Sequence, residues 1–179
     1  PATAEAQLLL ARLLERRGRA REALPIAQRA YGVVAAANGP ESPEALAALE
    51  QLAACEAGVG RRGEAERDLR RVIAMRTRAW GPGDPFALRA AHALANVLRD
   101  GGRTGDAALL YRRTLAAQSA QLGETHAATL ATAFDFARMR LRQRRAAEAL
   151  PLLEWAARGA GAAAPRERLL YGTALGSLL

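Results

Sequence analysis

A set of features recurs every 42 residues along this chain of 179 residues, and this constant period limits the possible folds more than any other property of the sequence. An acidic residue followed by alanine occurs four times at that interval, at Glu22-Ala23, Glu64-Ala65, Asp106-Ala107 and Glu148-Ala149. A glycine followed by arginine keeps the same interval at Gly18, Gly60 and Gly102. Several features in one register predict an array of similar units that stack on one another.

Each repeat reads as two amphipathic helices separated by a glycine. In the third repeat, apolar residues at Leu88, Ala91, Leu94 and Leu98 follow the spacing of one buried helical stripe, and Gly101-Gly102 ends it. Ser42 and Asp84 stand before prolines, as N-caps do. The pattern predicts first helices at 3–17, 43–58, 85–100 and 126–142 and second helices at 20–37, 62–79, 104–121 and 146–158.

Composition supports an all-α protein. Half of the residues are apolar but only 4% are aromatic, which favours close-packed helices over sheets. The net charge of +8 comes entirely from arginine, and the arginines are interspersed with acidic residues. We therefore expect a solvated helical surface, and nucleic-acid binding through the arginines is the less favoured alternative.

Cysteine usage and hydropathy bear on the compartment. Cys55, the single cysteine, lies in an apolar helical run, so no disulfide can form within the chain and we expect a small buried residue. The sequence shows no apolar run of membrane-spanning length and no signal-peptide pattern, which predicts a cytoplasmic protein. The chain starts at Pro1 and finishes within an apolar helical pattern, so we expect a fragment of a longer protein.

No pattern of catalytic residues emerges. The two histidines and the cysteine fall on different predicted helices, which argues against a metal site. A phosphate-binding loop of the Walker type needs a lysine, and the chain has none. We predict that the chain is not an enzyme and requires no cofactor.

These repeats resemble the tetratricopeptide repeat in the 42-residue form of kinesin light chains. The resemblance rests on a large residue followed by alanine in each first helix, on an alanine early in each second helix, and on the loop between repeats. These motifs are Leu10-Ala11, Leu52-Ala53, Leu94-Ala95 and Phe136-Ala137, then Ala23, Ala65, Ala107 and Ala149, then Trp80-Gly81-Pro82-Gly83-Asp84-Pro85 and Leu122-Gly123-Glu124-Thr125-His126-Ala127. The form is common in bacteria, so we expect a bacterial member.

The resemblance implies a right-handed α-solenoid over residues 1–179. Its repeats would span about 3–42, 43–84, 85–126 and 127–164, followed by a terminal half-repeat at 165–179. The family usually closes the first helix with a bulky residue, but Glu56 and Arg140 occupy that place here, so we expect looser packing there. The last half-repeat would leave Leu175, Leu178 and Leu179 uncovered, which raises the possibility of self-association.

In the family, the first helices line a concave groove that binds protein or peptide segments. Carried onto this sequence, the groove would be lined by Arg12, Glu50, Arg89, His92, Asn96, Arg99, Phe134, Asp135, Arg138 and Arg142. Its basic excess favours an acidic segment, because arginine binds carboxylates through two parallel hydrogen bonds. Two alternatives stay open for these residues. The arginines can pair with neighbouring acids such as Asp100, and Phe134 can belong to the core.

The resemblance does not identify the partner, since one scaffold serves many functions. The main prediction is a scaffold that binds a protein or peptide in the groove. A different role, in which the solenoid acts as a sensor within a larger bacterial signalling or transcription-control protein, is the main alternative. Trp80, Trp155 and His126 are predicted to have structural roles.

Overall fold

The computed structural model describes residues 2–160 and residue 173, and within these residues the chain forms eight helices and no strand. The helices are α1 (Ala2–Arg16), α2 (Ala20–Asn38), α3 (Pro43–Gly58), α4 (Arg62–Trp80), α5 (Pro85–Asp100), α6 (Thr104–Leu122), α7 (Ala127–Arg142) and α8 (Ala146–Ala160). Every helix begins and ends within two residues of its predicted bounds, so the all-α prediction is confirmed.

The chain divides into two compact units at Gly101 and Gly102. Unit 1 holds α1 to α5 and unit 2 holds α6 to α8, so the two helices of the third predicted repeat belong to different units. The proposed division into repeats of one solenoid stays a prediction. The terminal half-repeat at 165–179, with the self-association expected from it, lies outside the described residues except for residue 173.

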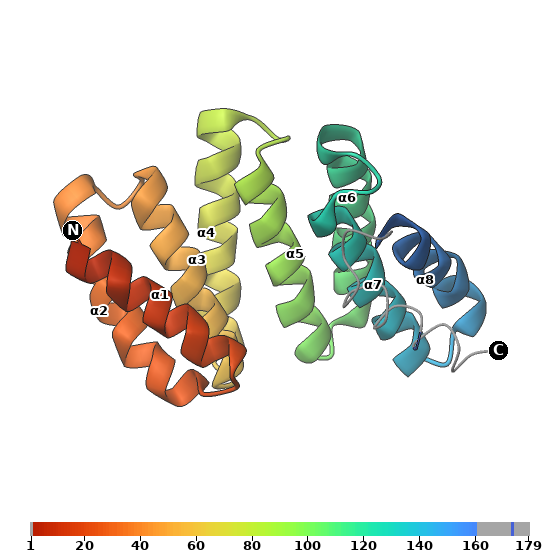
Figure 1. Cartoon of the computed structure of the whole chain (residues 1–179), viewed down its shortest axis with the longest axis horizontal. Helices are drawn as coiled ribbons and strands as arrows, with labels where there is room; N and C mark the ends of the chain where they lie inside the picture. The colour runs from red at the N-terminus through yellow and green to blue at the C-terminus, as the bar shows by residue number, and fades with distance from the viewer. Residues whose placement is uncertain (1, 161–172, 174–179) are drawn as a thin grey trace. The chain divides into compact units, whose positions relative to one another are not determined.

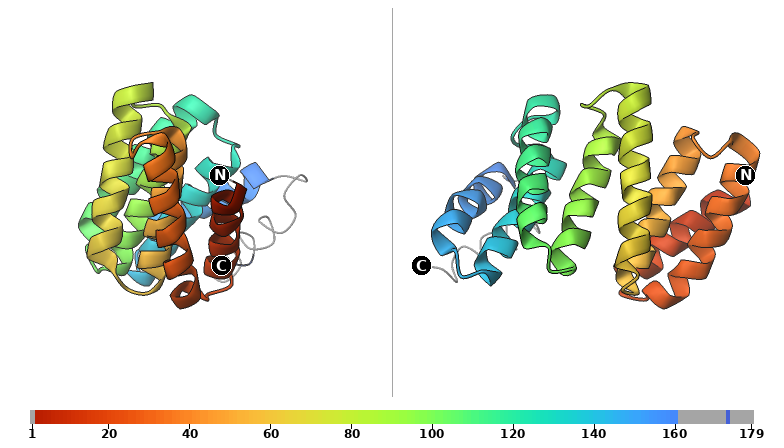
Figure 2. Two further views of the ribbon diagram at one scale, coloured as in Figure 1. Left: turned by 90° about the vertical axis from the view of Figure 1, so that its left-hand side faces the viewer. Right: turned by 180° about the vertical axis from the view of Figure 1, so that it is seen from behind.

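In unit 1 the helices form two layers. Consecutive helices pack against each other from α1 to α5, and α3 also contacts α1 and α5 directly. The first helices α1, α3 and α5 thus form one layer, which faces the viewer in Figure 1. The second helices α2 and α4 form the other layer, seen from behind in Figure 2. The arrangement leaves one surface made entirely of first helices.

Three helices begin with a side-chain cap, and the caps keep the interval of the repeat. Each capping side chain accepts a hydrogen bond from a backbone N–H in the first turn, which satisfies a donor that the helix leaves unpaired. The pairs are Ser42 with Ala45 (3.1 Å), Asp84 with Ala87 (2.7 Å) and His126 with Ala128 (3.2 Å). The structural role predicted for His126 is therefore confirmed.

The turn inside each helix pair needs a residue with positive φ. Gly18, Gly60 and Gly102 adopt φ of 74°, 87° and 80°, which glycine does without a steric penalty. In the fourth repeat the same place holds Arg144, whose φ is 58°. A side chain at this φ costs about 1 kcal/mol, so the fourth turn is strained relative to the other three.

Alanine occupies the closest contacts between helices. The alanines of the repeat motif have no measurable exposure, and they are Ala11, Ala53, Ala95 and Ala137 in the first helices and Ala23, Ala65, Ala107 and Ala149 in the second helices. In unit 2 the buried ring of Tyr111 stacks on Phe136 with 5.4 Å between ring centroids. Small residues let the helix axes approach, and one large ring fills the space that remains.

Candidate functional site

The surface formed by α1, α3 and α5, called here the first-helix face, carries two adjoining hollows of about 310 and 290 Å³. The first is lined by Arg12, Glu15, Arg16, Ala47, Glu50, Gln51, Ala54, Arg89 and Ala93. The second is lined by Glu15, Ala53, Ala54, Ala57, Gly58, Leu69, Ala93, Asn96, Val97 and Asp100. Both hollows share Glu15, Ala54 and Ala93, so they form one continuous groove within unit 1.

The floor and the rims of this groove differ in chemistry. Its apolar floor contains Ala54 and Ala93, which line both hollows and are half-buried. These alanines are particular to this part of the chain, because the residues 42 positions later are Asn96 and Asp135. Its rims carry charged and amide side chains from all three helices. A narrow apolar floor between polar rims can accept a peptide backbone that hydrogen-bonds to both sides.

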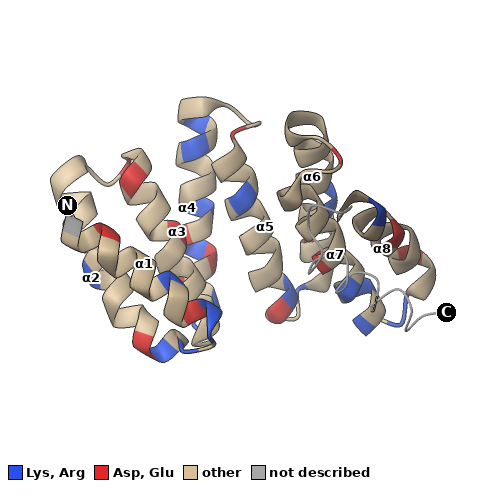
Figure 3. Cartoon of the chain, viewed as in Figure 1, with Lys and Arg blue, Asp and Glu red and all other residues tan. Residues whose placement is uncertain are grey.

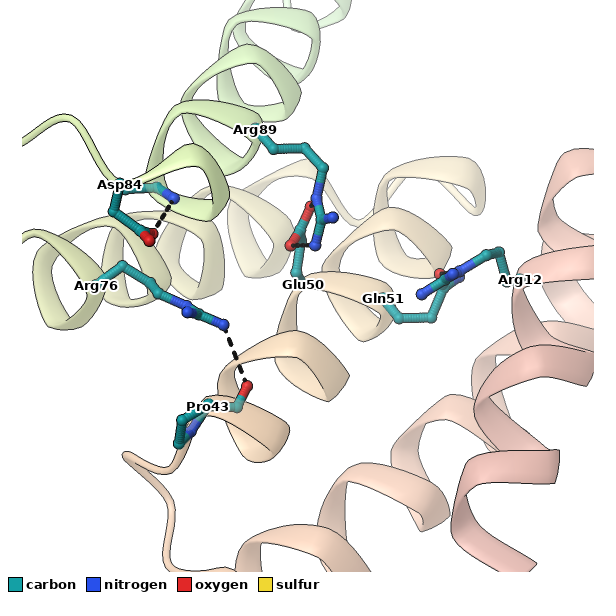
Figure 4. A network of polar contacts seen from close by, with 8 residues as sticks. Arg12, Pro43, Glu50, Gln51, Arg76, Asp84 and Arg89 are labelled. Atoms are coloured by element: carbon teal, nitrogen blue, oxygen red, sulfur yellow. Dashed lines mark hydrogen bonds and ion pairs between the residues drawn. The ribbon is translucent and has the colours of Figure 1, made fainter. Parts of the chain in front are cut away.

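Two polar contacts hold neighbouring first helices together across the groove, as Figure 4 shows. Arg89 of α5 donates to both carboxylate oxygens of Glu50 on α3, at 2.7 and 2.6 Å. Arg12 of α1 donates from Nε to the side-chain oxygen of Gln51 on α3, at 3.2 Å. Both pairs are separated by 39 residues in sequence. The paired carboxylate raises the pKa of Arg89, mainly through these hydrogen bonds.

The other predicted residues of α5 form a chain of contacts along one side of that helix. His92 Nε2 lies 3.4 Å from the Asn96 amide nitrogen, and the Asn96 oxygen accepts from Arg99 at 2.8 Å. Arg99 also pairs with Asp100 at 2.8 Å. Arg99 therefore pairs with a neighbouring acid, which is the alternative left open by the sequence. As a result, Arg99 adds little unpaired positive charge to the groove.

In unit 2 the four predicted residues lie on α7. Asp135 pairs with Arg138 at 3.6 Å, and Arg142 is exposed. Phe134, predicted to be the aromatic of the groove, is only 8% exposed and belongs to a core cluster with Leu130 and Leu153. The prediction of an accessible groove aromatic is wrong for Phe134, because its apolar ring packs in the core while Arg138 lies over it at 5.8 Å.

Several residues of the groove were not predicted. Gln51 and Glu15 line it, and so does Arg16, an exposed arginine at the end of α1. The signal that could have identified Gln51 is the separation of 39 residues, which brings positions on adjacent first helices face to face. Burial raises the pKa of Glu15 although Arg16 opposes the shift, so this carboxylate is partly desolvated in the groove wall.

A periodic set of ion pairs involves four of the 26 arginines. The arginine that precedes each second helix pairs with the acidic residue of its first turn, three positions later. These pairs are Arg19–Glu22, Arg61–Glu64, Arg103–Asp106 and Arg145–Glu148. Figure 3 shows the two signs interspersed on the described helices. This pattern supports a solvated surface over a nucleic-acid site, because pairing reduces the charge available to phosphates.

Arg76 forms a cluster with two exposed aromatic residues at one edge of the first-helix face. Its guanidinium lies 4.7 Å from the Trp80 ring centre and 4.3 Å from that of Phe86, and it donates to the Pro43 carbonyl (Figure 4). Trp80 is 46% exposed. Its contact with Arg76 tethers the loop before α5, which is compatible with the packing role predicted for it.

Residues 2–160 offer neither a metal-binding cluster nor a membrane-spanning helix. No group of three or more histidine, cysteine, aspartate or glutamate residues there is arranged to hold a metal ion. None of the described helices is long and apolar enough to cross a bilayer. Cys55 is buried as predicted, and its burial raises the pKa of the thiol.

Comparisons with known proteins place these observations in a family. Residues 2–78 match the tetratricopeptide repeat family. A putative kinesin light chain from Podosopora anserina with nearly identical repeats is 25% identical, with 97% of this chain and 84% of that chain covered and a TM-score of 0.78. BtubC (BKLC) from P. vanneervenii is 17% identical, with 99% and 72% covered and a TM-score of 0.80.

A third similar structure is a Rap protein complexed with competence and sporulation factor. It is 14% identical, with 98% of this chain and 52% of that chain covered and a TM-score of 0.61. No curated protein matches the sequence at a significant level.

The chain consists of helix pairs that repeat at a constant interval, with side-chain caps at helix N-termini and alanines between neighbouring helices. These features define the class of α-solenoid repeat proteins. Within that class, residues 2–78 match the tetratricopeptide repeat, and the fold is similar to that of a putative kinesin light chain with such repeats. The resemblance noted in the sequence is thus confirmed.

Proposed function

We propose that this chain is a protein-interaction scaffold and that the first-helix face of unit 1 binds an extended peptide segment. The observation that carries the proposal is the continuous groove across α1, α3 and α5, with an alanine floor between polar rims. Bound segments in this position would meet pre-formed side chains, since Arg12 and Arg89 are already fixed by Gln51 and Glu50. Such pre-organisation lowers the entropy cost of binding.

A preference for acidic segments is the finer part of the proposal. The first hollow is lined by three arginines and two glutamates. Glu50 takes up the charge of Arg89, whereas Arg12 contacts a neutral amide and Arg16 is exposed. The end of the groove near α1 is therefore the place for a carboxylate of the partner, where an arginine can donate two hydrogen bonds.

The binding proposal is tested with peptides selected from a displayed random library on the wild-type protein. We expect Ala93→Arg, which fills the groove floor, to weaken the selected peptides by about tenfold or more. Ala74→Gln on the exposed side of α4 is the matched control and should leave affinity unchanged. Equal affinity of the two variants, with circular dichroism confirming that both are folded, would contradict binding at this face.

The acidic preference is tested separately, by isothermal titration with acidic and neutral versions of a selected peptide at two salt concentrations. Arg12→Gln should remove most of the advantage of the acidic peptide, while Arg17→Gln, outside the groove, should not. Salt should weaken the acidic peptide more, because screening acts on exposed charges. If both versions bind equally at low salt, the acidic preference is wrong although the groove can still be the site.

A further inference from the structure

Unit 2 contains a larger hollow whose lining includes none of the residues predicted for the groove. Its volume is about 490 Å³, and it is lined by Arg112, Leu115, Ala116 and Ser119 of α6, Phe136 and Arg140 of α7, and Glu148, Pro151, Leu152 and Trp155 of α8. The space lies between two second helices, with α7 contributing one wall. This volume falls within the range of pockets that hold small organic ligands.

Most of the lining is apolar, and one aromatic wall is fixed in place. Leu115, Phe136 and Leu152 contribute apolar surface, and Trp155 adds the indole. The indole nitrogen of Trp155 donates to the Glu124 carbonyl at 3.1 Å, which holds the ring at the side of the hollow. An apolar group that entered the hollow would therefore meet a preformed surface and release ordered water from it.

The polar part of the lining carries excess positive charge. Arg140, which is 6% exposed, lies 3.2 Å from Glu148 and 4.9 Å from the Phe136 ring centre. Glu148 also pairs with Arg145 at 2.5 Å, so a single carboxylate serves two arginines. Arg112 is the second arginine of the lining, and no ion pair of it is found among residues 2–160.

Two further observations describe how the lining would interact with an anion. Burial lowers the pKa of Arg140, and the charges of Arg145 and Arg112 lower it further against the effect of Glu148. The hydroxyl oxygen of Ser119 is buried at the lining without a hydrogen-bond partner in the described part of the chain. A negatively charged oxygen in the hollow would offset the repulsion between the arginines and could accept from the hydroxyl.

We propose that this hollow binds a small amphipathic carboxylate, with its apolar portion against Trp155 and Leu152 and its carboxylate at Arg112. The apolar walls supply affinity and the guanidinium supplies selectivity for the charged head group. The site is independent of the peptide groove, because it lies in the other unit and shares no residue with it.

The test uses decanoate below its micelle concentration, with decanol as the uncharged probe of equal chain length. The chain has two tryptophans, so Trp80→Phe leaves Trp155 as the only indole and its fluorescence reports on the hollow directly. We expect a saturable change of Trp155 emission, with decanoate binding about tenfold more tightly than decanol. Equal affinities, or no saturable change with decanoate, would overturn the proposal.

Variants in the same background locate the binding. Arg112→Gln should lower decanoate affinity about tenfold and leave decanol unchanged, because only the charged head group loses its partner. Arg113→Gln, the adjacent exposed arginine that does not line the hollow, is the matched control and should have no effect. Ala116→Phe should abolish the binding of both probes by filling the space. Equal losses in the two arginine variants would show a general charge effect and would overturn the site.

Discussion

The second and fourth repeats place opposite charges at one buried position, and the two sites handle those charges differently. Glu56 at the end of α3 and Arg140 at the end of α7 are 3% and 6% exposed. In the third repeat the same place holds Leu98, which is also buried. This position is thus buried in all three of these repeats. The neighbouring residues determine the free-energy cost of placing a charge there.

Glu56 is buried without compensation. One of its carboxylate oxygens has no hydrogen-bond partner in the described part of the chain. Burial, helped by the charges of Asp68 and Glu64, raises its pKa to about 7 although Arg67 and Arg61 oppose the shift. The carboxyl is therefore protonated in the folded protein at a pH where an unfolded chain would have ionised it.

Arg140 is buried with more compensation, although its Nε forms no hydrogen bond within the described part of the chain. Its guanidinium pairs with Glu148, donates to the Gln143 side chain at 3.0 Å and lies over the ring of Phe136. The corresponding second-helix acid of unit 1, Glu64, pairs only with Arg61. The expectation of looser packing fits Arg140, beside which a hollow opens. It does not fit Glu56, which is enclosed and 3% exposed.

The largest effect is expected from Glu56→Gln, which removes the ionisable group and keeps the shape. Because the folded pKa lies above the unfolded one, wild-type stability should fall as pH rises from about 4.5 to about 7. The variant should lack this dependence and gain about 2–3 kcal/mol in free energy of unfolding at pH 8. Urea denaturation at pH 5 and pH 8 measures both quantities, and Glu41→Gln, at an exposed carboxylate that does not act on Glu56, serves as control. A wild-type stability that does not fall over this range would contradict the assigned pKa.

A smaller effect should follow from Glu148→Gln, which removes the carboxylate shared by Arg140 and Arg145. Because Glu148 is partly exposed, we expect a loss of about 1–2 kcal/mol rather than the full cost of an unpaired buried charge. The equivalent change Glu22→Gln affects only an exposed pair and should cost much less. Thermal denaturation of both variants gives the comparison, and similar losses would mean that Arg140 does not depend on Glu148.

The smallest effect concerns the turn that leads into α8. Arg144→Gly should stabilise the protein by about 0.5–1 kcal/mol, because Arg144 adopts the positive φ that glycine takes in the other repeats. The reverse change Gly60→Ala in unit 1 should destabilise it by a similar amount. Chemical denaturation of both variants measures whether each change raises or lowers the free energy of unfolding. A loss of stability in Arg144→Gly would show that its side chain contributes more than the strained backbone costs.

The sequence predicted the helices and much of the core because the repeat encodes them locally. Ala53 and Ala95 mark the helix contacts, and Ser42 and Asp84 mark the starts, so the period alone places them. The repeat could not predict whether Phe134 is buried or exposed, since the equivalent residues Glu50 and His92 are only half-buried. An apolar ring at that position gains more from packing in the core than from facing solvent.

The candidate site was predicted less completely. The period identifies which helix faces are equivalent, but it does not state how the arginines on them are paired. The contacts of Arg89 with Glu50 and of Arg12 with Gln51 depend on the offset between neighbouring helices, which becomes visible only in three dimensions. The hollow beside Trp155 depends on side chains that differ between repeats, so self-similarity gave no indication of it.

The most direct test of the scaffold proposal is an amide chemical-shift map of the protein with a library-selected peptide. We expect the largest shifts along the first-helix face, at Arg12, Gln51, Ala54, Arg89 and Ala93, with small shifts on α2 and α4. Shifts concentrated on α2 and α4 instead would contradict the claim that this repeat protein binds its partner on the surface of its first helices.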